Sequence, residues 1–238
     1  MLECQKGGYR FLKSGRPYSA GVVAAPGFEI VHARFAAPPV LAAGFEATAG
    51  HLASLGRPKQ ALCAMELRCP RPMSLEEFKE FNDGYCSVLS KWGILGEGFN
   101  PVARTNVSPV VAPPSEPLLY GFSYTISSAA GGETFVIAGA GERGEGAGRA
   151  SDIVRWGETT EDAMAEKALS VCNRITERLS GLGLEWSAAT AVNIYTAHAC
   201  VASEVLGELP VTWHYARPPI VDIEFEMDVR RYRHEVLL

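Results

Sequence analysis

The strongest signal for the fold comes from two neighbouring segments, SLEEFKEFNDGYCSVLSKW at 74–92 and NPVARTNV at 100–107. The first segment repeats large apolar side chains at helical spacing, and Ser74 with Glu77 makes a capping-box sequence, so we predict a helix. The second segment predicts a short strand with Arg104 at its centre. A guanidinium is costly to bury without a partner, so Arg104 requires either a structural ion pair or a ligand.

The remainder of the first half continues the alternation of strands and helices. Strands are predicted within 17–35, where Pro26-Gly27 marks a turn, and at 61–69 and 118–125. A helix is predicted over 38–56, because its leucines and Phe45 share one face and Gly56 occupies the place of a C-terminal cap. The first half therefore has the order β-β-α-β-α-β-β.

The second half repeats this order. A helix is predicted over 159–183, with Thr159 as its cap, and a shorter one over roughly 198–206. The predicted strands are 133–141, 187–197, 211–216 and 220–229. We therefore expect an α+β fold of two tandem units, 16–127 and 128–238, each a mixed sheet with its helices packed on one face.

Composition narrows the class of protein. The net charge is −5, the pI is about 5.6 and no basic stripe occurs, so no nucleic-acid partner is expected. No apolar run is long enough to span a bilayer, and the N-terminal residues lack the apolar core of a signal peptide, so we expect a cytoplasmic protein without a membrane partner. The six cysteines form no C-x-x-C pair, which favours reduced thiols and argues against a metal site. The arginines at 230, 231 and 233 are interpreted as the solvated end of the last strand.

Several motifs in both halves resemble those of one enzyme family. In the first half they are PYSAGVV (17–23), FKEFNDGY (78–85) and PVARTNV (101–107); in the second, FVIAGAGE (135–142), GLGL (181–184) and RPPIVDIEFEMDVR (217–230). Their order is similar to that of the RidA/YjgF imine deaminases, seen here as two diverged copies. The resemblance implies chorismate-mutase-like units and a homo-oligomer, with a trimer favoured, whose sites lie between units.

The same resemblance assigns six residues to a site for a small carboxylate. Arg104 matches the arginine that binds the substrate carboxylate, and Glu224 matches the glutamate that positions or activates water. The residues matched to substrate-binding positions are Tyr18, Asn82, Asn106 and Gly139.

The two halves carry complementary parts of this pattern. The first half has Arg104, but the position of Gly139 is occupied there by the segment His32-Ala33-Arg34. The second half has Gly139 and Glu224 but no matching arginine. We therefore expect one composite site between a first half and a second half.

A guanidinium anchor with a carboxylate general acid or base suits hydrolysis of a C=N bond beside a carboxylate, without a cofactor. The resemblance implies an enamine or imine substrate such as 2-aminomuconate. We also expect four further polar residues to help a dicarboxylate bind: His32, Arg34, His214 and Arg217.

Alternatives remain open at the level of the sequence. Arg104 could be a structural arginine, and Glu224 could belong to an ordinary solvated face with Asp222, Glu226 and Asp228. The glycine run GAGERG at 139–144 fits a dinucleotide fingerprint, although a glycine-rich stretch rather than a helix follows it. A carboxylate-binding regulator without catalysis and a chorismatase-type hydrolase are the alternative functions.

Overall fold

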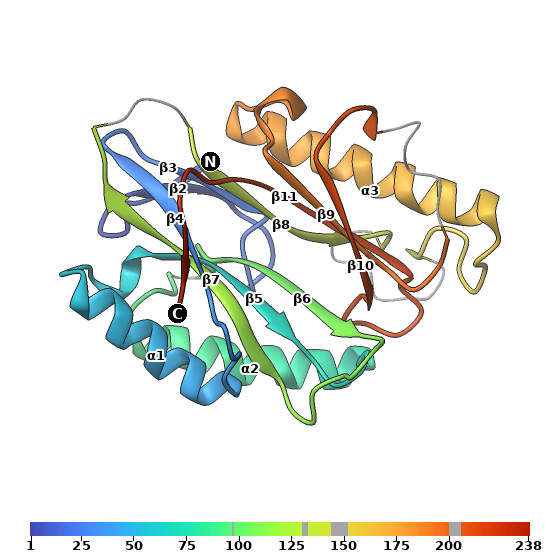
Figure 1. Cartoon of the computed structure of the whole chain (residues 1–238), viewed down its shortest axis with the longest axis horizontal. Helices are drawn as coiled ribbons and strands as arrows, with labels where there is room; N and C mark the ends of the chain where they lie inside the picture. Colours follow the sequence, from blue (N-terminus) through green and yellow to red (C-terminus); the bar gives the residue numbers. More distant parts are fainter. Residues whose placement is uncertain (97, 130–132, 144–151, 200–205) are drawn as a thin grey trace.

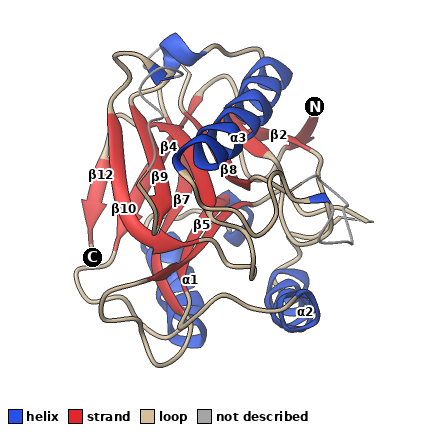
Figure 2. Ribbon diagram, turned by 90° about the vertical axis from the view of Figure 1, so that its right-hand side faces the viewer, coloured by secondary structure: helices blue, strands red, loops and turns tan. Residues whose placement is uncertain are grey.

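A computed structural model describes all residues except 97, 130–132, 144–151 and 200–205. Within these residues the fold is mixed α+β: twelve strands form one sheet, and three α-helices cover it (Figure 1). Helix α3 lies on the opposite side of the molecule from α1 and α2 (Figure 2). The α+β class expected from the sequence is confirmed.

The helices are α1 (Leu41–Ser54), α2 (Leu75–Lys91) and α3 (Glu161–Leu182), with single-turn 3-10 helices at Lys59–Ala61 and Trp186–Ala188. The strands up to residue 127 are β1 (Leu2–Cys4), β2 (Tyr9–Leu12), β3 (Gly21–Ala24), β4 (Phe28–Arg34), β5 (Leu62–Arg68), β6 (Ala103–Pro109) and β7 (Leu118–Ser127). The later strands are β8 (Phe135–Gly141), β9 (Ala191–Thr196), β10 (Val211–Arg217), β11 (Phe225–Arg231) and β12 (Glu235–Leu237).

The strand order is β1-β2-β3-β8-β11-β9-β10-β6-β5-β7-β4-β12. Strands β5, β6, β7 and β4 therefore form one side of the sheet, and β8, β11, β9 and β10 form the other. The two parts of the chain exchange edge strands, since β3 pairs with β8 and the C-terminal β12 pairs with β4. The predicted division between residues 127 and 128 stays a prediction.

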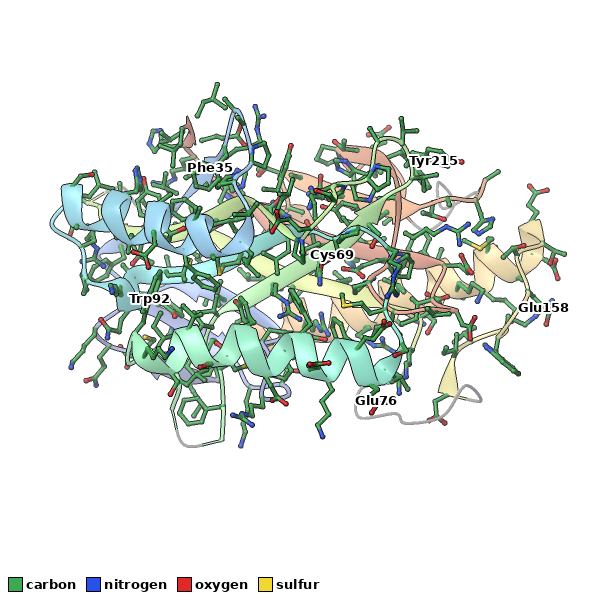
Figure 3. The ribbon with its side chains drawn as sticks, turned by 90° about the horizontal axis from the view of Figure 1, so that it is seen from below. Phe35, Cys69, Glu76, Trp92, Glu158 and Tyr215 are labelled. Carbon is green, nitrogen blue, oxygen red and sulfur yellow. The ribbon has the colours of Figure 1, made fainter. Side chains whose placement is uncertain are left out.

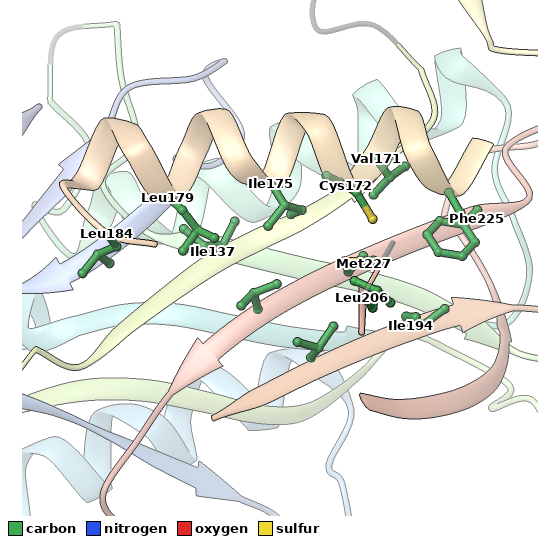
Figure 4. Packing of buried hydrophobic residues seen from close by; sticks show 14 of the residues in the cluster. Ile137, Val171, Cys172, Ile175, Leu179, Leu184, Ile194, Leu206, Phe225 and Met227 are labelled. Carbon is green, nitrogen blue, oxygen red and sulfur yellow. The ribbon is translucent and has the colours of Figure 1, made fainter. Parts of the chain in front are cut away.

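Each side of the sheet has its own core. Helix α3 packs Val171, Ile175 and Leu179 against Phe225 and Met227 of β11 (Figure 4). On the other side, α1 and α2 lie next to each other across the sheet (Figure 3), and the rings of Phe45 and Trp92 meet edge to face at 5.4 Å. These two cores hold the strands that supply the site.

Local signals in the sequence are confirmed at two helix ends. Ser74 and Glu77 form both bonds of the capping box at the start of α2. Gly56 follows α1 with a φ of 64°, the left-handed conformation that favours glycine. Helix α3 is capped at Thr160 rather than Thr159, without a side-chain bond. Most of the helix predicted over 198–206 lies outside the described residues.

Three strands were not predicted from the sequence. Strands β1 and β2 form a hairpin that extends the sheet beside β3, and β12 follows the last predicted strand. All three are short, with four residues or fewer, so they offer little periodicity.

The sheet curls so that β6 also approaches β3 and β8. The backbone N–H of Ser19 donates to the carbonyl of Val102 at 3.0 Å, and Ser19 forms a parallel bridge with Ala103. A Cβ placed on Gly139 of β8 would lie 3.3 Å from Cγ2 of Thr105 on β6. This closure brings the two sides of the sheet together around a polar interior.

The polar interior contains a buried ionic network, which corrects the sequence-based interpretation of the last strand. Arg230 is 4% exposed; it donates two 2.7 Å hydrogen bonds to Asp228 and also pairs with Glu66 of β5. The same oxygen of Glu66, Oε1, also lies 2.7 Å from Nε2 of His32. Arg230 is thus not a solvated end of the sheet, because the curl of the sheet turns this face of β11 inward.

Candidate active site

A cavity of about 490 Å³ lies where β6, β8 and β11 meet α2, α3 and the segment before β3. Its lining is polar on the β6, β8 and α3 sides and apolar where the residues before β11 close it. The lining residues are Ser14, Gly15, Pro17, Tyr18, Phe78, Arg104, Asn106, Gly139, Ala140, Gly141, Arg143, Arg174, Arg178, Pro219, Ile220, Ile223 and Glu226. The volume is in the usual range for a small-molecule site.

Arg104 is 3% exposed and sits among aromatic rings. Its guanidinium carbon lies 4.7 Å from the ring centre of Tyr85, 5.0 Å from that of Tyr18 and 5.6 Å from that of Phe78. Aromatic faces stabilise a cation without neutralising its charge. The side chain is therefore held in place while its charge remains available to an anion.

The hydrogen bonds of β6 leave donors for a ligand. One terminal nitrogen of Arg104 donates to Oδ1 of Asn82 at 2.6 Å, and the other has no hydrogen-bond partner within the described part of the chain. Asn106 lies two residues along the same face, where its Oδ1 accepts from Cys69 and its Nδ2 likewise has no partner there. Buried donors are normally satisfied, so these two nitrogens indicate a place for an acceptor such as a carboxylate.

Because Gly139 has no side chain, the carboxyl group of Glu226 can lie close to strand β8 at the wall of the cavity. A Cβ at this position would lie 2.1 Å from Oε1 of Glu226, far inside contact distance. Glu226 lies on β11, 5% exposed, and lines the same cavity as Arg104. The absence of a side chain on β8 thus gives the Glu226 carboxylate its position.

The environment of Glu226 favours its neutral form. Burial, together with the charge of Asp228 two residues away, raises its pKa to about 8, although Arg104 and Arg178 act in the opposite direction. At neutral pH this carboxyl group is therefore mainly protonated. A protonated carboxylic acid beside a charged arginine can donate a proton to a substrate and recover it from water.

Glu224, the glutamate singled out in the sequence, does not line the cavity. Its carboxylate lies 2.9 Å from Nε2 of His198, and its backbone N–H donates to Glu142. Strand β11 begins only at Phe225, and the chain before it turns through Asp222, which has a φ of 70°. The strand alternation assumed for 220–229 therefore does not extend to Glu224, and Glu226 takes the place facing Arg104.

Four of the six predicted residues line the cavity together: Tyr18, Asn106, Arg104 and Gly139. Asn82 lies behind Arg104 as its hydrogen-bond partner, and Glu224 lies outside. Both halves of the protein contribute to this cavity, because Arg104 comes from the first half and Gly139 from the second half of one chain.

Two arginines of α3, Arg174 and Arg178, line the cavity but were not identified from the sequence. Arg174 donates to the carbonyl oxygens of Gly141 and Arg143, the latter at 2.5 Å. Arg178 donates to the carbonyl of Ala138 at 2.9 Å. Arg174 and Arg178 are four residues apart on α3, so they occupy one face, which is the only signal the sequence offered for them.

The polar residues expected to help a dicarboxylate bind do not line the cavity. His32 lies between Glu66 and Glu235, and His214 stacks on Tyr195. Arg34 pairs with Glu235, and Arg217 is exposed on β10. The curled sheet places these four residues in the interior network or on other surfaces, so none of them contributes to this cavity.

The glycine run does not form a dinucleotide turn where it can be described. Residues 139–141 continue strand β8, and no helix opens at 142–143. Residues 144–151, which complete the motif, lie outside the described residues. Across the described ranges, no group of three or more metal-ligating side chains is present, and no helix is long and apolar enough to cross a membrane.

Glu142, directly after β8, fixes the start of β11. Its carboxylate accepts hydrogen bonds from the backbone N–H groups of Glu224 and Phe225, at 2.7 and 3.1 Å. It also meets the buried ammonium of Lys167 on α3 at 3.1 Å. This pair ties α3 to the two strands that carry Gly139 and Glu226, so the register between them is fixed.

Comparisons with known proteins identify the family and the fold. The chain matches the 2-aminomuconate deaminase CnbZ family over residues 1–236. It is 39% identical to a 2-amino-5-chloromuconate deaminase of Comamonas testosteroni, covering 98% of this chain and 96% of the relative. A crystal structure of a chorismatase shares the fold, with a TM-score of 0.53 at 11% identity, over 93% of this chain and 80% of that one. The chain belongs to the 2-aminomuconate deaminase CnbZ family.

Proposed function

We propose that this protein hydrolyses the enamine 2-aminomuconate, or a closely similar ring-cleavage product, and releases ammonia without a cofactor. One observation carries the proposal: Arg104, with a terminal nitrogen left for a ligand, shares a cavity with Glu226, whose pKa is raised to about 8. The family supports the same reaction, and its relative acts on a chlorinated form of this substrate by name.

The reaction divides into steps that these groups suit. The enamine takes a proton on carbon from neutral Glu226, which converts it into an imine beside the carboxylate. Glu226, now a carboxylate, removes a proton from water as the water oxygen bonds to the imine carbon. The hydroxyl proton of the resulting carbinolamine passes to the amino group, the C–N bond breaks, ammonia leaves and a 2-oxo acid remains.

Arg104 binds the carboxylate next to the reacting carbon. A guanidinium holds a carboxylate with parallel hydrogen bonds, which fixes the position of the carbon as well as the charge. Asn106 supplies a further donor from the same strand face. Since Arg104 also lowers the pKa of Glu226, a bound anion on Arg104 would favour the protonated acid that the first step requires.

The first experiment measures ammonia released from freshly generated 2-aminomuconate. Wild-type protein should release one ammonia per substrate, and Arg104→Ala should lose about 1.5–3 kcal/mol of substrate binding, seen mainly as a higher KM. Arg16→Ala, which removes an exposed arginine beside the cavity, is the matched control and should behave as wild type.

Calorimetry on the same samples distinguishes a binding protein from an enzyme. Substrate binding without ammonia release would reject the proposed reaction and favour a non-catalytic carboxylate binder. The chorismatase likeness concerns the fold. Incubation with chorismate in a separate assay should show no consumption, and its hydrolysis would favour the chorismatase-type alternative.

Two further expectations remain proposals about organisation. We infer that the chain is a tandem of two related units, supported by the repeated strand order on the two sides of the sheet. A homo-oligomer, with a trimer favoured, is supported by the exposed aromatic side chains Trp213 and Tyr215 on β10. Light scattering of the purified protein measures the number of subunits.

A further inference from the structure

Cys69 is a buried thiol that the proposed reaction does not use. It follows strand β5 directly and is 1% exposed. Its backbone N–H donates to the carbonyl of Val107 on β6 at 2.8 Å, which continues the pairing of the two strands by one residue. Among the described residues, Cys69 does not line the cavity, but its Sγ lies 3.0 Å from Oδ1 of Asn106, which does.

The direction of this hydrogen bond follows from the chemistry of the two groups. A thiol donates through its S–H, whereas the oxygen of an amide only accepts. Burial raises the pKa of the Cys69 thiol, although Asn106, Arg104 and Arg68 act in the opposite direction, so the thiol keeps its proton at neutral pH. Cys69 is therefore the donor, and the oxygen of the Asn106 amide is the acceptor.

This bond decides which end of the Asn106 amide the cavity meets. The oxygen and the NH2 group of a side-chain amide have nearly the same shape, so a neighbouring contact must fix their orientation. Cys69 holds the oxygen. Asn106 is 3% exposed, and its Nδ2 is buried without a hydrogen-bond partner in the described part of the chain. The amide is thus left with two N–H groups to offer to a ligand.

The opposite orientation would work against an anionic ligand. It would turn Oδ1 of Asn106 toward the cavity, on the face of β6 that also carries Arg104. An oxygen there would repel a carboxylate and would compete with it for the terminal nitrogen of Arg104 that has no partner among the described residues. A thiol that holds the oxygen keeps both donors for the ligand.

We propose that Cys69 is a positioning residue for substrate binding: its thiol holds the Asn106 amide so that Nδ2 donates to the carboxylate bound by Arg104. This inference rests on the proposed function only in taking an anion as the ligand of the cavity. The thiol itself does not touch the substrate and takes no part in the chemical steps.

The test is the affinity for muconate, an unreactive compound that lacks the amino group, measured by calorimetry at pH 7. Cys69→Ala removes the donor and frees the amide to turn, so muconate should bind about fivefold more weakly, as expected for one hydrogen bond. Cys69→Ser restores a donor at the same place, and its affinity should stay within about twofold of wild type.

Three results would overturn the proposal. They are an unchanged affinity in Cys69→Ala, an equal loss in Cys69→Ser, and failure of the wild-type protein to bind muconate, because the anion site that the thiol completes would then be lacking.

A double-mutant cycle separates positioning from packing. Asn106→Ala removes the amide, so adding Cys69→Ala to it should change the affinity by less than about 1.5-fold. An equal loss in both backgrounds would show a packing defect and reject the role. Cys63→Ala is the matched control, because Cys63 is also a free, buried thiol on β5 but lies outside the cavity lining, and it should bind muconate like wild type.

Turnover of 2-aminomuconate supplies an independent readout. Cys69→Ala should raise KM about fivefold and leave kcat close to wild type, because the amide acts on binding rather than on proton transfer. A lower kcat with an unchanged KM would contradict the role.

The binding and turnover measurements distinguish this inference from the proposed reaction. Muconate binding that depends on Cys69, without ammonia release, would reject only the reaction. Ammonia release with a muconate affinity that is independent of Cys69 would reject only the positioning role. Circular dichroism of each variant, unchanged from wild type, excludes unfolding as the cause of a lower affinity.

Discussion

The surroundings of Arg104 fix the position of its guanidinium group but leave one of its terminal nitrogens without a hydrogen-bond partner among the described residues. Asn82 accepts one hydrogen bond at 2.6 Å and the ring of Tyr85 lies 4.7 Å away, but neither carries a negative charge. A structural arginine would be expected to meet a carboxylate, as Arg230 meets Asp228 and Glu66. The contrast between these two buried arginines supports a ligand-binding role for Arg104.

Gly139→Ala tests whether the bare backbone of β8 positions Glu226. The new methyl group would lie 2.1 Å from Oε1 of Glu226 and must displace it, while the backbone conformation of residue 139 permits alanine. We expect kcat to fall by about 100-fold, as for other small misplacements of a reacting group, with little change in Tm.

Gly50→Ala is the matched control for this substitution. It lies on α1 with nothing within 4 Å of the added Cβ. It should leave kcat unchanged. A Gly139→Ala enzyme with wild-type kcat would show that the close approach of β8 to Glu226 is irrelevant to turnover.

The raised pKa of Glu226 predicts that the free energy of unfolding decreases as the pH rises. Its pKa is about 8 in the folded protein and near 4.5 when unfolded, so between these values the folded state binds more protons. The free energy of unfolding therefore falls with increasing pH, by up to about 1.4 kcal/mol per pH unit, and this contribution levels off above pH 8. Glu226→Gln removes the effect.

Urea unfolding of wild type and Glu226→Gln between pH 5 and pH 9 measures this contribution. The difference in unfolding free energy should grow in favour of the variant up to about pH 8. A difference that does not vary with pH would contradict the neutral, buried state of this carboxyl group.

The sequence predicted part of the site because some residues are marked by local motifs. Arg104, Asn106, Tyr18 and Gly139 stand in recognisable strand segments and meet in the cavity. The glutamate that lines the cavity, Glu226, lies two positions after the predicted Glu224, because the turn at Asp222 and the start of β11 cannot be predicted from the alternation of 220–229. The arginines of α3 carry no motif, since they reach the cavity only through the packing of the helix.

Strand β11 connects the cavity with the buried ionic network. Glu226 faces the cavity, and on the same side of the strand Asp228 accepts hydrogen bonds from Thr105, Asn193 and Tyr195, each at 2.9 Å. Asp228 is also one of the charges that raise the pKa of Glu226. The strand therefore carries both the proposed general acid, Glu226, and the neighbouring carboxylate that raises its pKa.

Arg230→Met tests the contribution of β11 to stability. The variant leaves Glu66 and Asp228 buried without their cation, so we expect the free energy of unfolding to fall by about 3–5 kcal/mol. Arg231→Met is the control, because the neighbouring Arg231 is partly exposed and makes one long hydrogen bond to the Ala188 carbonyl at 3.4 Å.

Chemical denaturation at pH 7 measures both variants. Equal stabilities would show that the network adds nothing to the joining of the two sides of the sheet.

The network could not be found from the sequence, because its members come from β5 and β11, more than 160 residues apart, and the alternation of charges alone predicted a solvated face.

At the scale of the whole molecule, the curl of the sheet decides where chemistry can occur. Arg104 comes from the side of the sheet covered by α1 and α2, and Gly139 and Glu226 come from the side covered by α3 (Figure 1). The α+β class followed from the order of the elements. The exchange of edge strands did not, because pairing of β3 with β8 and of β12 with β4 depends on long-range packing.

The central claim is that the cavity between these two sides performs deamination with Glu226 as its acid and base. The most direct measurement is kcat for ammonia release from 2-aminomuconate by two variants, Glu226→Gln and Glu224→Gln. They make the same chemical change at positions two residues apart. Glu226→Gln should lower kcat by about 10²- to 10⁴-fold, and Glu224→Gln, which lies outside the cavity beside His198, should stay close to wild type. A large loss in Glu224→Gln with an active Glu226→Gln would contradict the account.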